Sequence, residues 1–317
     1  MSNQPDLHDS ISHTRRADDA TPVRLFIFGA FVLSLSLCFF GTFKSLTSLA
    51  LHDELHSHIF LVPFISIYIL YIIRDQLPTK YCSSLLWTFV ALAAGAAFLT
   101  LASASDSSWL TASMLSFVCF LCAGGFVFLG RYWMQAAAFP FAFLLFMAPL
   151  PAAVIEWLEY ASKLASAQCA SFFFHLSGIP VLRDGTIFQL PGIVIEVAQE
   201  CSGIRSSWVL LIASILASYL FLRRSRNRLI LVAVAIPLGV LRNGFRITVI
   251  GLLCARFGPQ MIHSAIHRRG GPVFFVLSLI PLIALLWLLR RREERFRGGL
   301  GKQRPGAGNE PGILTNS

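Results

Sequence analysis

The sequence predicts an all-α protein: a polytopic transmembrane helical bundle of about eight spans, with a short periplasmic helix and a β-hairpin before span six. Two features lead to this fold class. Hydrophobic residues make up 56% of the 317 residues and charged residues only 13%, with a mean hydropathy of +0.68. A soluble domain is typically about one quarter charged. The apolar residues also gather in long runs, which favours lipid as their solvent.

Eight segments are apolar and long enough to be interpreted as membrane-spanning helices, which need roughly 20 residues. They are 25–43, 59–73, 85–104, 109–129, 136–154, 205–222, 229–254 and 272–289. The second segment is short, and we expect it to extend over His58 or Arg74.

Lysine and arginine in the loops predict the orientation, because cytoplasmic loops carry an excess of these residues. With the amino terminus in the cytoplasm, the outside loops hold only Lys44, Lys163, Arg183, Arg256, Arg268 and Arg269. Both termini are therefore expected inside. The Gly, Pro, Ser and Asn content of the ends predicts disordered cytoplasmic tails at 1–22 and 293–317, the second of them basic, around a transmembrane domain at 23–292.

The segment 151–204 is then the longest outside segment. Its first part, Ile155 to Leu176, carries charged residues among apolar ones and is expected to form an amphipathic helix at the outer interface. The β-branched runs at 181–190 and 193–197 surround Gly185 and a Pro-Gly pair, and they predict a short extended hairpin.

Charge and cysteine content exclude two other classes of protein. The net charge of +10 lies in short runs beside apolar segments, such as 223–224 and 290–292, so it indicates topology and no nucleic-acid partner. The seven cysteines are an odd number without framework spacing, which argues against a disulfide scaffold.

Cys201 is the candidate nucleophile. It lies where the long outside segment meets the sixth span, in the run Glu-Cys-Ser-Gly-Ile at 200–204. A thiolate at a helix amino terminus is stabilised by the helix dipole and by free backbone N–H groups. The alternative is a cysteine that only packs at a helix end.

The seventh span contains the strongest exception to the apolar pattern, the run Leu-Arg-Asn-Gly-Phe-Arg-Ile at 241–247. Ionisable residues inside a span are costly and are functional candidates by default. Arg242 and Arg246 are four residues apart and share one helix face, with Asn243 beside them. Alternatively, Arg246 only extends to the interface or pairs with Glu196 or Glu200.

Two histidines, His263 and His267, lie just before the eighth span. A histidine at the outer face can act as a general base or acid at neutral pH, although lipid headgroup binding is an alternative. The predicted topology places Cys201, Arg246 and His267 on the same side of the membrane. A thiol, a guanidinium and an imidazole together support covalent acyl transfer.

A second group of histidines, His52, His56 and His58, lies beside Asp53 and Glu54 in the first outside loop. This group could hold a metal ion, but we favour a solvated face. We expect no metal and no organic cofactor.

Several motifs resemble those of the exosortase/archaeosortase family. Cys-Ser-Gly-Ile at 201–204 resembles the family's Cys-Ser/Thr-Gly signature, and Asn-Gly-Phe-Arg at 243–246 resembles its Asn-x-x-Arg motif after a proline. His-Arg-Arg-Gly-Gly at 267–271 is similar to the His-x-x-x-Gly element before the last helix, and 183–190 to the strand before the cysteine. The proline-flanked segment 139–151 resembles the family's fifth helix. The resemblance covers roughly residues 25–290.

The resemblance implies a membrane-embedded cysteine transpeptidase or protease in the bacterial inner membrane, with its active site on the periplasmic side. Its partners would be exported proteins that end in a Pro-Glu-Pro-like motif, a spanning helix and a basic tail, cleaved near the motif and transferred to a surface acceptor. Members often accompany exopolysaccharide production.

The resemblance also implies a role for each residue of the site. Cys201 would be the nucleophile, Arg246 the oxyanion or thiolate stabiliser, and His267 the general acid/base. Arg242 is the second choice for the family arginine, because spacing from Pro237 favours Arg246. The glycine four residues on favours His267 over His263.

Two other classes of function remain as alternatives. One is a membrane transporter with the seventh span as its substrate site, although the paired repeats usual in transporters are not visible in the sequence. The other is a non-catalytic assembly factor for exopolysaccharide export.

Overall fold

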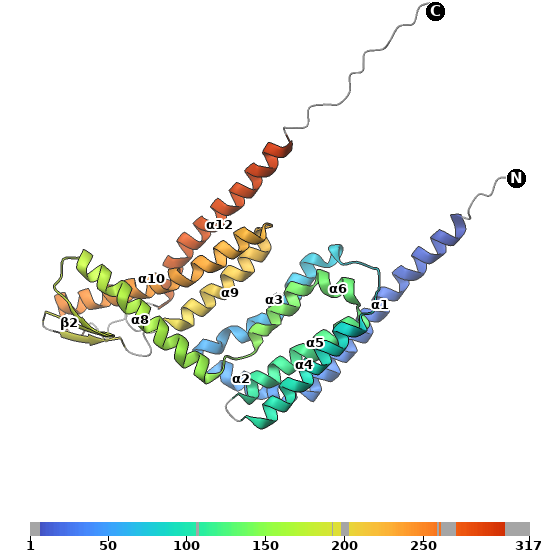
Figure 1. Cartoon of the computed structure of the whole chain (residues 1–317), viewed down its shortest axis with the longest axis horizontal. Helices are drawn as coiled ribbons and strands as arrows, with labels where there is room; N and C mark the ends of the chain where they lie inside the picture. The colour runs from blue at the N-terminus through green and yellow to red at the C-terminus, as the bar shows by residue number, and fades with distance from the viewer. Residues whose placement is uncertain are drawn as a thin grey trace, which may run out of the picture. The chain divides into compact units, whose positions relative to one another are not determined.

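The computed structural model describes residues 7–105, 108–191, 193–197, 203–258, 260 and 271–301. The chain forms two compact units, 1–156 and 157–317, and each is described by itself. Helices dominate both units (Figure 1). The prediction of an all-α, polytopic helical fold with a small β element is confirmed.

The first unit consists of helices joined by short 3-10 turns. The helices are α1 Leu7–Cys38, α2 Phe40–His52, α3 Leu61–Ile73, α4 Leu85–Ala104, α5 Trp109–Phe128, α6 Arg131–Ala136 and α7 Ala138–Phe143. The 3-10 turns are η1 Glu54–Phe60, η2 Arg74–Gln76 and η3 Leu144–Met147. Helix α5 is central, because α1, α2 and α4 all contact it.

Small residues allow α4 and α5 to pack closely. The Ser116 hydroxyl donates a 2.8 Å hydrogen bond to the carbonyl oxygen of Gly95 across the two helices. A Cβ atom at Gly95 would lie 2.7 Å from the ring of Phe120, so a larger residue would require that ring or the helices to shift. Close approach at small residues is the usual basis of helix association in membranes.

The second unit contains most of α8 Ala152–Leu176, whose first five residues belong to the first unit, followed by a sheet and three long helices. The strands are β1 Leu182–Asp184, β2 Ile187–Leu190 and β3 Ile193–Glu196, and the helices are α9 Ile204–Phe221, α10 Ser225–Phe257 and α12 Gly271–Gly301. Helix α10 packs against both α9 and α12.

The predicted extended segment is an antiparallel three-stranded sheet in the order β1-β2-β3, so it has two reversals where the sequence predicted one hairpin. The run 181–190 reverses direction at Gly185, whose φ of +58° is accessible to glycine at little cost. Phe188 and Ile195 pair across the sheet and share one hydrophobic core with Phe174 of α8 and Ile250 of α10. The sheet therefore helps to hold α8 and α10 together.

Among the described residues, six helices are long and apolar enough to cross a membrane, or up to eight if each of two bent pairs is one span. They are Leu55–Gln76, Leu85–Ala104, Trp109–Phe128, Ile204–Phe221, Ser225–Phe257 and Gly271–Arg295. Large apolar side chains on these helices are exposed, for example Phe89 and Ile283. A lipid environment accounts for that exposure, since soluble monomers rarely expose large contiguous apolar patches.

Two predicted spans differ from the structure. The first bends by 72° where α1 meets α2, at Phe39. The fifth, 136–154, is wrong as a single helix. It is divided among the last residue of α6, α7, η3, an extended segment and the start of α8. Pro140 would remove the hydrogen bond to the Ala136 carbonyl, where α6 ends, and Pro149 disfavours helical geometry at Ala148, which is extended.

The ends of the helices extend into the ranges predicted to be tails. Helix α1 begins at Leu7, within 1–22, and α12 continues to Gly301, within 293–317.

Glu293 of α12 connects that helix to the turn between α9 and α10. Its carboxylate accepts hydrogen bonds from the backbone N–H groups of Arg223 and Arg224, at 2.9 and 3.0 Å, and from the Asn227 amide at 2.8 Å. The side chain is almost fully covered, with 8% of the residue exposed. The carboxylate also complements the positive amino-terminal end of α10.

Glu293→Ala is expected to destabilise the second unit by about 1–3 kcal/mol, because it leaves covered N–H donors without an acceptor. Glu294 is the matched control: it is exposed, and within the described residues its polar contact is an i,i+4 ion pair with Arg290. Glu294→Ala should change stability by less than about 0.5 kcal/mol. Thermal unfolding in detergent measures both variants, and equal effects would contradict the role of Glu293.

Candidate functional site

The start of α9 follows the candidate nucleophile directly. Cys201 and Ser202 lie outside the described residues, and the description resumes at Gly203, the N-cap of the helix. Gly203 has a φ of +70°, in the left-handed region that favours glycine. Its carbonyl oxygen accepts the first hydrogen bond of the helix, from the N–H of Ser207 at 3.0 Å. This hydrogen bond holds Gly203, which lies two residues after Cys201 in the chain, at the start of α9.

Helix α10 contacts Gly203 through two residues that the sequence singled out. Nη2 of Arg242 donates to the Gly203 carbonyl oxygen at 3.2 Å and to the Ser207 hydroxyl at 3.3 Å. A Cβ atom at Gly203 would lie 2.5 Å from Cγ of Asn243. The residue at 203 therefore lacks a side chain for two reasons, its backbone conformation and the proximity of Asn243.

Asn243 links α10 to a third element of the site. Its Nδ2 donates a 3.0 Å hydrogen bond to the hydroxyl of Ser166 on α8, and only 1% of Asn243 is exposed. Gly244 allows this approach, because a Cβ atom there would lie 2.5 Å from Cβ of Cys169. Helices α8, α9 and α10 therefore meet around Gly203.

Arg242 is a buried cation beside an apolar cavity. The residue is 7% exposed, and none of the described residues accepts a hydrogen bond from its Nη1. The cavity has a volume of about 250 Å³ and lies among Phe173 of α8, Leu238 and Phe245 of α10, and Leu277 and Pro281 of α12. In such surroundings a positive charge acts on a nearby anion more strongly than it would in water.

Arg246 lies one helical turn after Arg242 on α10 and is half-buried. The two guanidinium groups are close enough to repel each other. Two neighbouring cations favour the charged form of an acid between them, which here would be a thiolate or an oxyanion. Arg242 therefore lies at the start of α9, and Arg246 adds a second positive charge close to it.

The structure brings together only part of the predicted site. Arg242 and Asn243 contact the segment that follows Cys201, and Arg246 is adjacent to them on α10. His263 and His267 lie outside the described residues, as Cys201 does. The meeting of Cys201, Arg246 and His267 therefore stays a prediction.

Sequence reasoning did not identify Ser166 and Ser207. Each receives a hydrogen bond from a residue of the 242–243 pair, and each comes from a different helix. Ser207 lies four residues after Gly203 and therefore on the same helix face, and this spacing could have identified it as a residue of the site. No comparable pattern marked Ser166.

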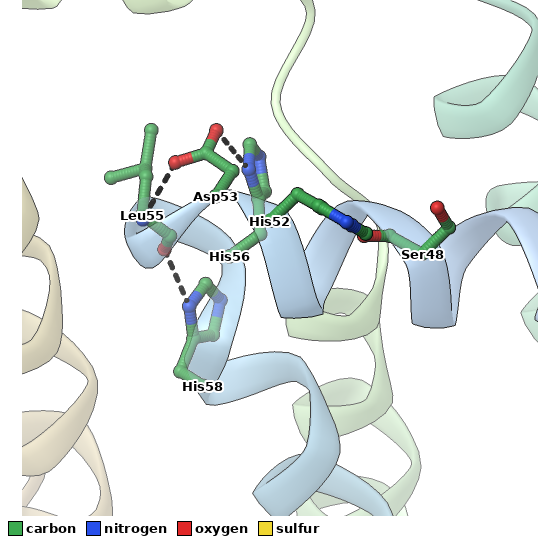
Figure 2. Close-up of polar contacts among 6 residues, drawn as sticks. All are labelled: Ser48, His52, Asp53, Leu55, His56 and His58. Carbon is green, nitrogen blue, oxygen red and sulfur yellow. Dashed lines mark hydrogen bonds and ion pairs between the residues drawn. The ribbon is translucent and has the colours of Figure 1, made fainter.

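The histidine group of the first unit is not a purely solvated face, since His56 is buried. Figure 2 shows the polar contacts of this group. Nδ1 of His56 lies 2.9 Å from Oδ2 of Asp53, whereas His52 and His58 direct their Nδ1 atoms to the backbone oxygens of Ser48 and Leu55, at 2.8 and 3.0 Å. Within the described part of the chain, no three His, Cys, Asp or Glu side chains are grouped as a metal site requires. This group therefore supports local structure at the turn between α2 and η1.

Comparison with known proteins gives one match. The family model of transmembrane exosortases matches residues 46–284, which include most of both units. A search of curated proteins and a search of solved structures found no match. The matched region contains Cys201, the whole of α10 and His267.

Proposed function

Because the chain belongs to the transmembrane exosortase family, we propose that it is a cysteine-dependent transpeptidase or protease embedded in the bacterial inner membrane. Its substrates are exported proteins with a carboxy-terminal sorting signal. That signal consists of a Pro-Glu-Pro-like motif, a spanning helix and a basic tail. The enzyme cleaves near the motif and transfers the new carboxyl end to a surface acceptor.

One observation supports this proposal most directly: α10 packs its Arg-Asn pair onto Gly203, two residues after Cys201 in the chain. Gly203 of the cysteine motif is thus in contact with Arg242 and Asn243 of the seventh span. A buried structural cysteine would need no cation beside its segment, whereas a reactive thiolate does. We propose that the neighbouring guanidinium groups of Arg242 and Arg246 provide this positive charge.

In the first half of the proposed reaction, the Cys201 thiolate attacks the carbonyl carbon of the scissile peptide bond. The resulting oxyanion is stabilised by the guanidinium of Arg246. When the C–N bond breaks, the leaving amine takes a proton from His267, and the target remains attached to Cys201 as a thioester. The released fragment carries the spanning helix and the basic tail.

In the second half, an acceptor nucleophile attacks the thioester carbonyl and transfers a proton to His267. The C–S bond breaks, and the Cys201 thiolate is regenerated. An amine or hydroxyl acceptor gives transpeptidation, and water gives hydrolysis. No electrons are exchanged with an external donor, so the cycle needs no redox partner.

The proposed location of this chemistry is the periplasmic side of the membrane, with both termini in the cytoplasm. The excess of lysine and arginine in alternate loops supports this orientation. A target whose own helix spans the same membrane would present its motif at that surface, while its basic tail would stay inside by the same rule.

Co-expression with a target that carries such a signal tests the proposed function. Intact-mass measurement of the target should show loss of the carboxy-terminal helix and tail when the chain is present. A target whose signal motif is replaced by glycine and serine is the control and should stay full length. If the target is shortened equally without the chain, or never shortened, the proposed function is wrong.

A further inference from the structure

A second cavity lies in the first unit, away from the candidate nucleophile in the sequence. Its volume is about 420 Å³, within the range of about 300–1,000 Å³ that is usual for small-molecule sites. Its walls come from α1, α2, η1, α3, α5, α7 and η3, all of which belong to one unit. It is therefore a feature of a single compact body.

The cavity, called the slot below, is lined mainly by apolar side chains, and α3 forms one of its walls. Its lining extends from Ile59 to Leu70, which corresponds to about 16 Å at the helical rise of 1.5 Å per residue. Thr47 and Met147 lie near the Ile59 end, since α2 and η3 finish there, whereas Phe28 and Pro140 lie toward the other end. The Ile59 end is next to the polar turn of Figure 2, which carries His52 and Asp53.

An apolar space of this size is unfavourable when it is empty, because the cost of a void increases with its volume. Water does not relieve that cost, since apolar cavities stay dry. Two helices that line the slot, the segment Leu55–Gln76 and α5, are candidate membrane spans. The apolar fluid next to them is lipid hydrocarbon.

One polar side chain in the wall has no partner among the described residues. Ser66, near the middle of the Leu55–Gln76 segment, is 3% exposed, and its Oγ forms no hydrogen bond with any of them. A serine in a helix commonly bonds a carbonyl oxygen of the preceding turn, as Ser36 does with Val32. Ser66, which lines the slot, makes no such bond with the described residues.

We propose that this slot binds one hydrocarbon chain of a membrane lipid, with the lipid's polar end at the turn between α2 and η1. The slot is lined by apolar residues along about 16 Å of α3, which is long enough for much of a single hydrocarbon chain, and one of its ends lies next to a polar turn. This inference does not depend on the proposed function, because no residue of the Cys201 site takes part in it.

Photolabelling in nanodiscs tests the proposal. The full-length protein is placed in phosphatidylcholine nanodiscs that contain a trace of phosphatidylglycerol with a diazirine in the middle of one acyl chain. Mass spectrometry then locates the labelled residues. We expect labels on Ser66, Leu70 and Phe117 to be about tenfold more frequent than on Ile72, which is exposed on the same helix outside the slot.

Ser66→Phe fills the slot and should lower labelling of its walls about tenfold, because losing about two buried methylene groups has that effect on occupancy. Ile72→Phe is the matched control and should leave the labelling unchanged. Leu144→Trp reduces the volume of the slot from its η3 wall and gives the same test if Ser66→Phe does not fold. Labels spread evenly over exposed helix faces in the wild type would show annular lipid only and would overturn the proposal.

Discussion

Replacing Cys201 with alanine is expected to abolish cleavage of the sorting signal while the amount of the protein in the membrane stays the same. Alanine removes the atom that forms the thioester, so the reaction has no covalent route. Loss of a catalytic nucleophile typically lowers turnover by about 10⁶-fold. Cys201→Ser should be nearly as inactive, because a hydroxyl group at neutral pH is a far weaker nucleophile than a thiolate. The intact mass of a co-expressed target measures cleavage.

Cys169→Ala is the matched control for this prediction. Cys169 is a free thiol on α8, in the same unit, and its Cβ atom packs against Gly244. Alanine keeps that Cβ contact, so the variant should cleave the target at close to the wild-type rate. If Cys201→Ala still shortens the target, the enzyme interpretation fails. The transporter and assembly-factor alternatives lose support if only Cys201→Ala is inactive.

The sequence predicted the spanning helices well where composition alone decides them. The segment 85–104 has the same bounds as α4, and 109–129 differs from α5 by one residue. Such runs contain no proline and few polar residues. In lipid they form helices, because a helix satisfies the backbone hydrogen bonds within the segment itself. The prediction of a single spanning helix at 136–154 was wrong, because an average of hydropathy does not register that a proline interrupts a helix. Pro140 and Pro149 act through backbone sterics, which a hydropathy average does not contain.

The site shows a different limit of sequence reasoning. The spacing of the two arginines placed them on one face of α10, but it did not show which other elements that face contacts. Spacing from Pro237 favoured Arg246 as the family arginine, whereas the structure places the side chain of Arg242 on the Gly203 carbonyl. The partner serines at 166 and 207 are separated from this pair by dozens of residues, and only the tertiary fold selects them.

These contacts suggest that the two arginines have different tasks. Nη2 of Arg242 donates hydrogen bonds to the Gly203 carbonyl oxygen and to the Ser207 hydroxyl, so protein groups already occupy part of this guanidinium. It is therefore suited to positioning the segment that contains Cys201. Arg246 is half-buried and lies one turn further along α10. It is suited to the developing negative charge of the reaction, in agreement with the proposed role.

Arg246→Lys is expected to lower the rate of target cleavage by about 10²–10³-fold, the usual cost of removing one oxyanion donor. Lysine keeps the charge but loses the planar fork that holds an oxyanion in a fixed direction. Arg242→Lys should have a smaller effect on the rate, about tenfold, together with a lower unfolding temperature, because it loses hydrogen bonds that hold Gly203. Cleavage rates and thermal unfolding in detergent measure the two effects.

Arg256→Lys is the control for both variants, because Arg256 lies in the last turn of the same helix and is exposed. It should change neither the rate nor the unfolding temperature. The two tasks separate because a positioning residue affects stability and rate together, whereas an oxyanion donor affects the rate alone. If Arg242→Lys were the slower enzyme and Arg246→Lys the less stable protein, the tasks would be exchanged, and Arg242 would be the arginine that acts on the substrate.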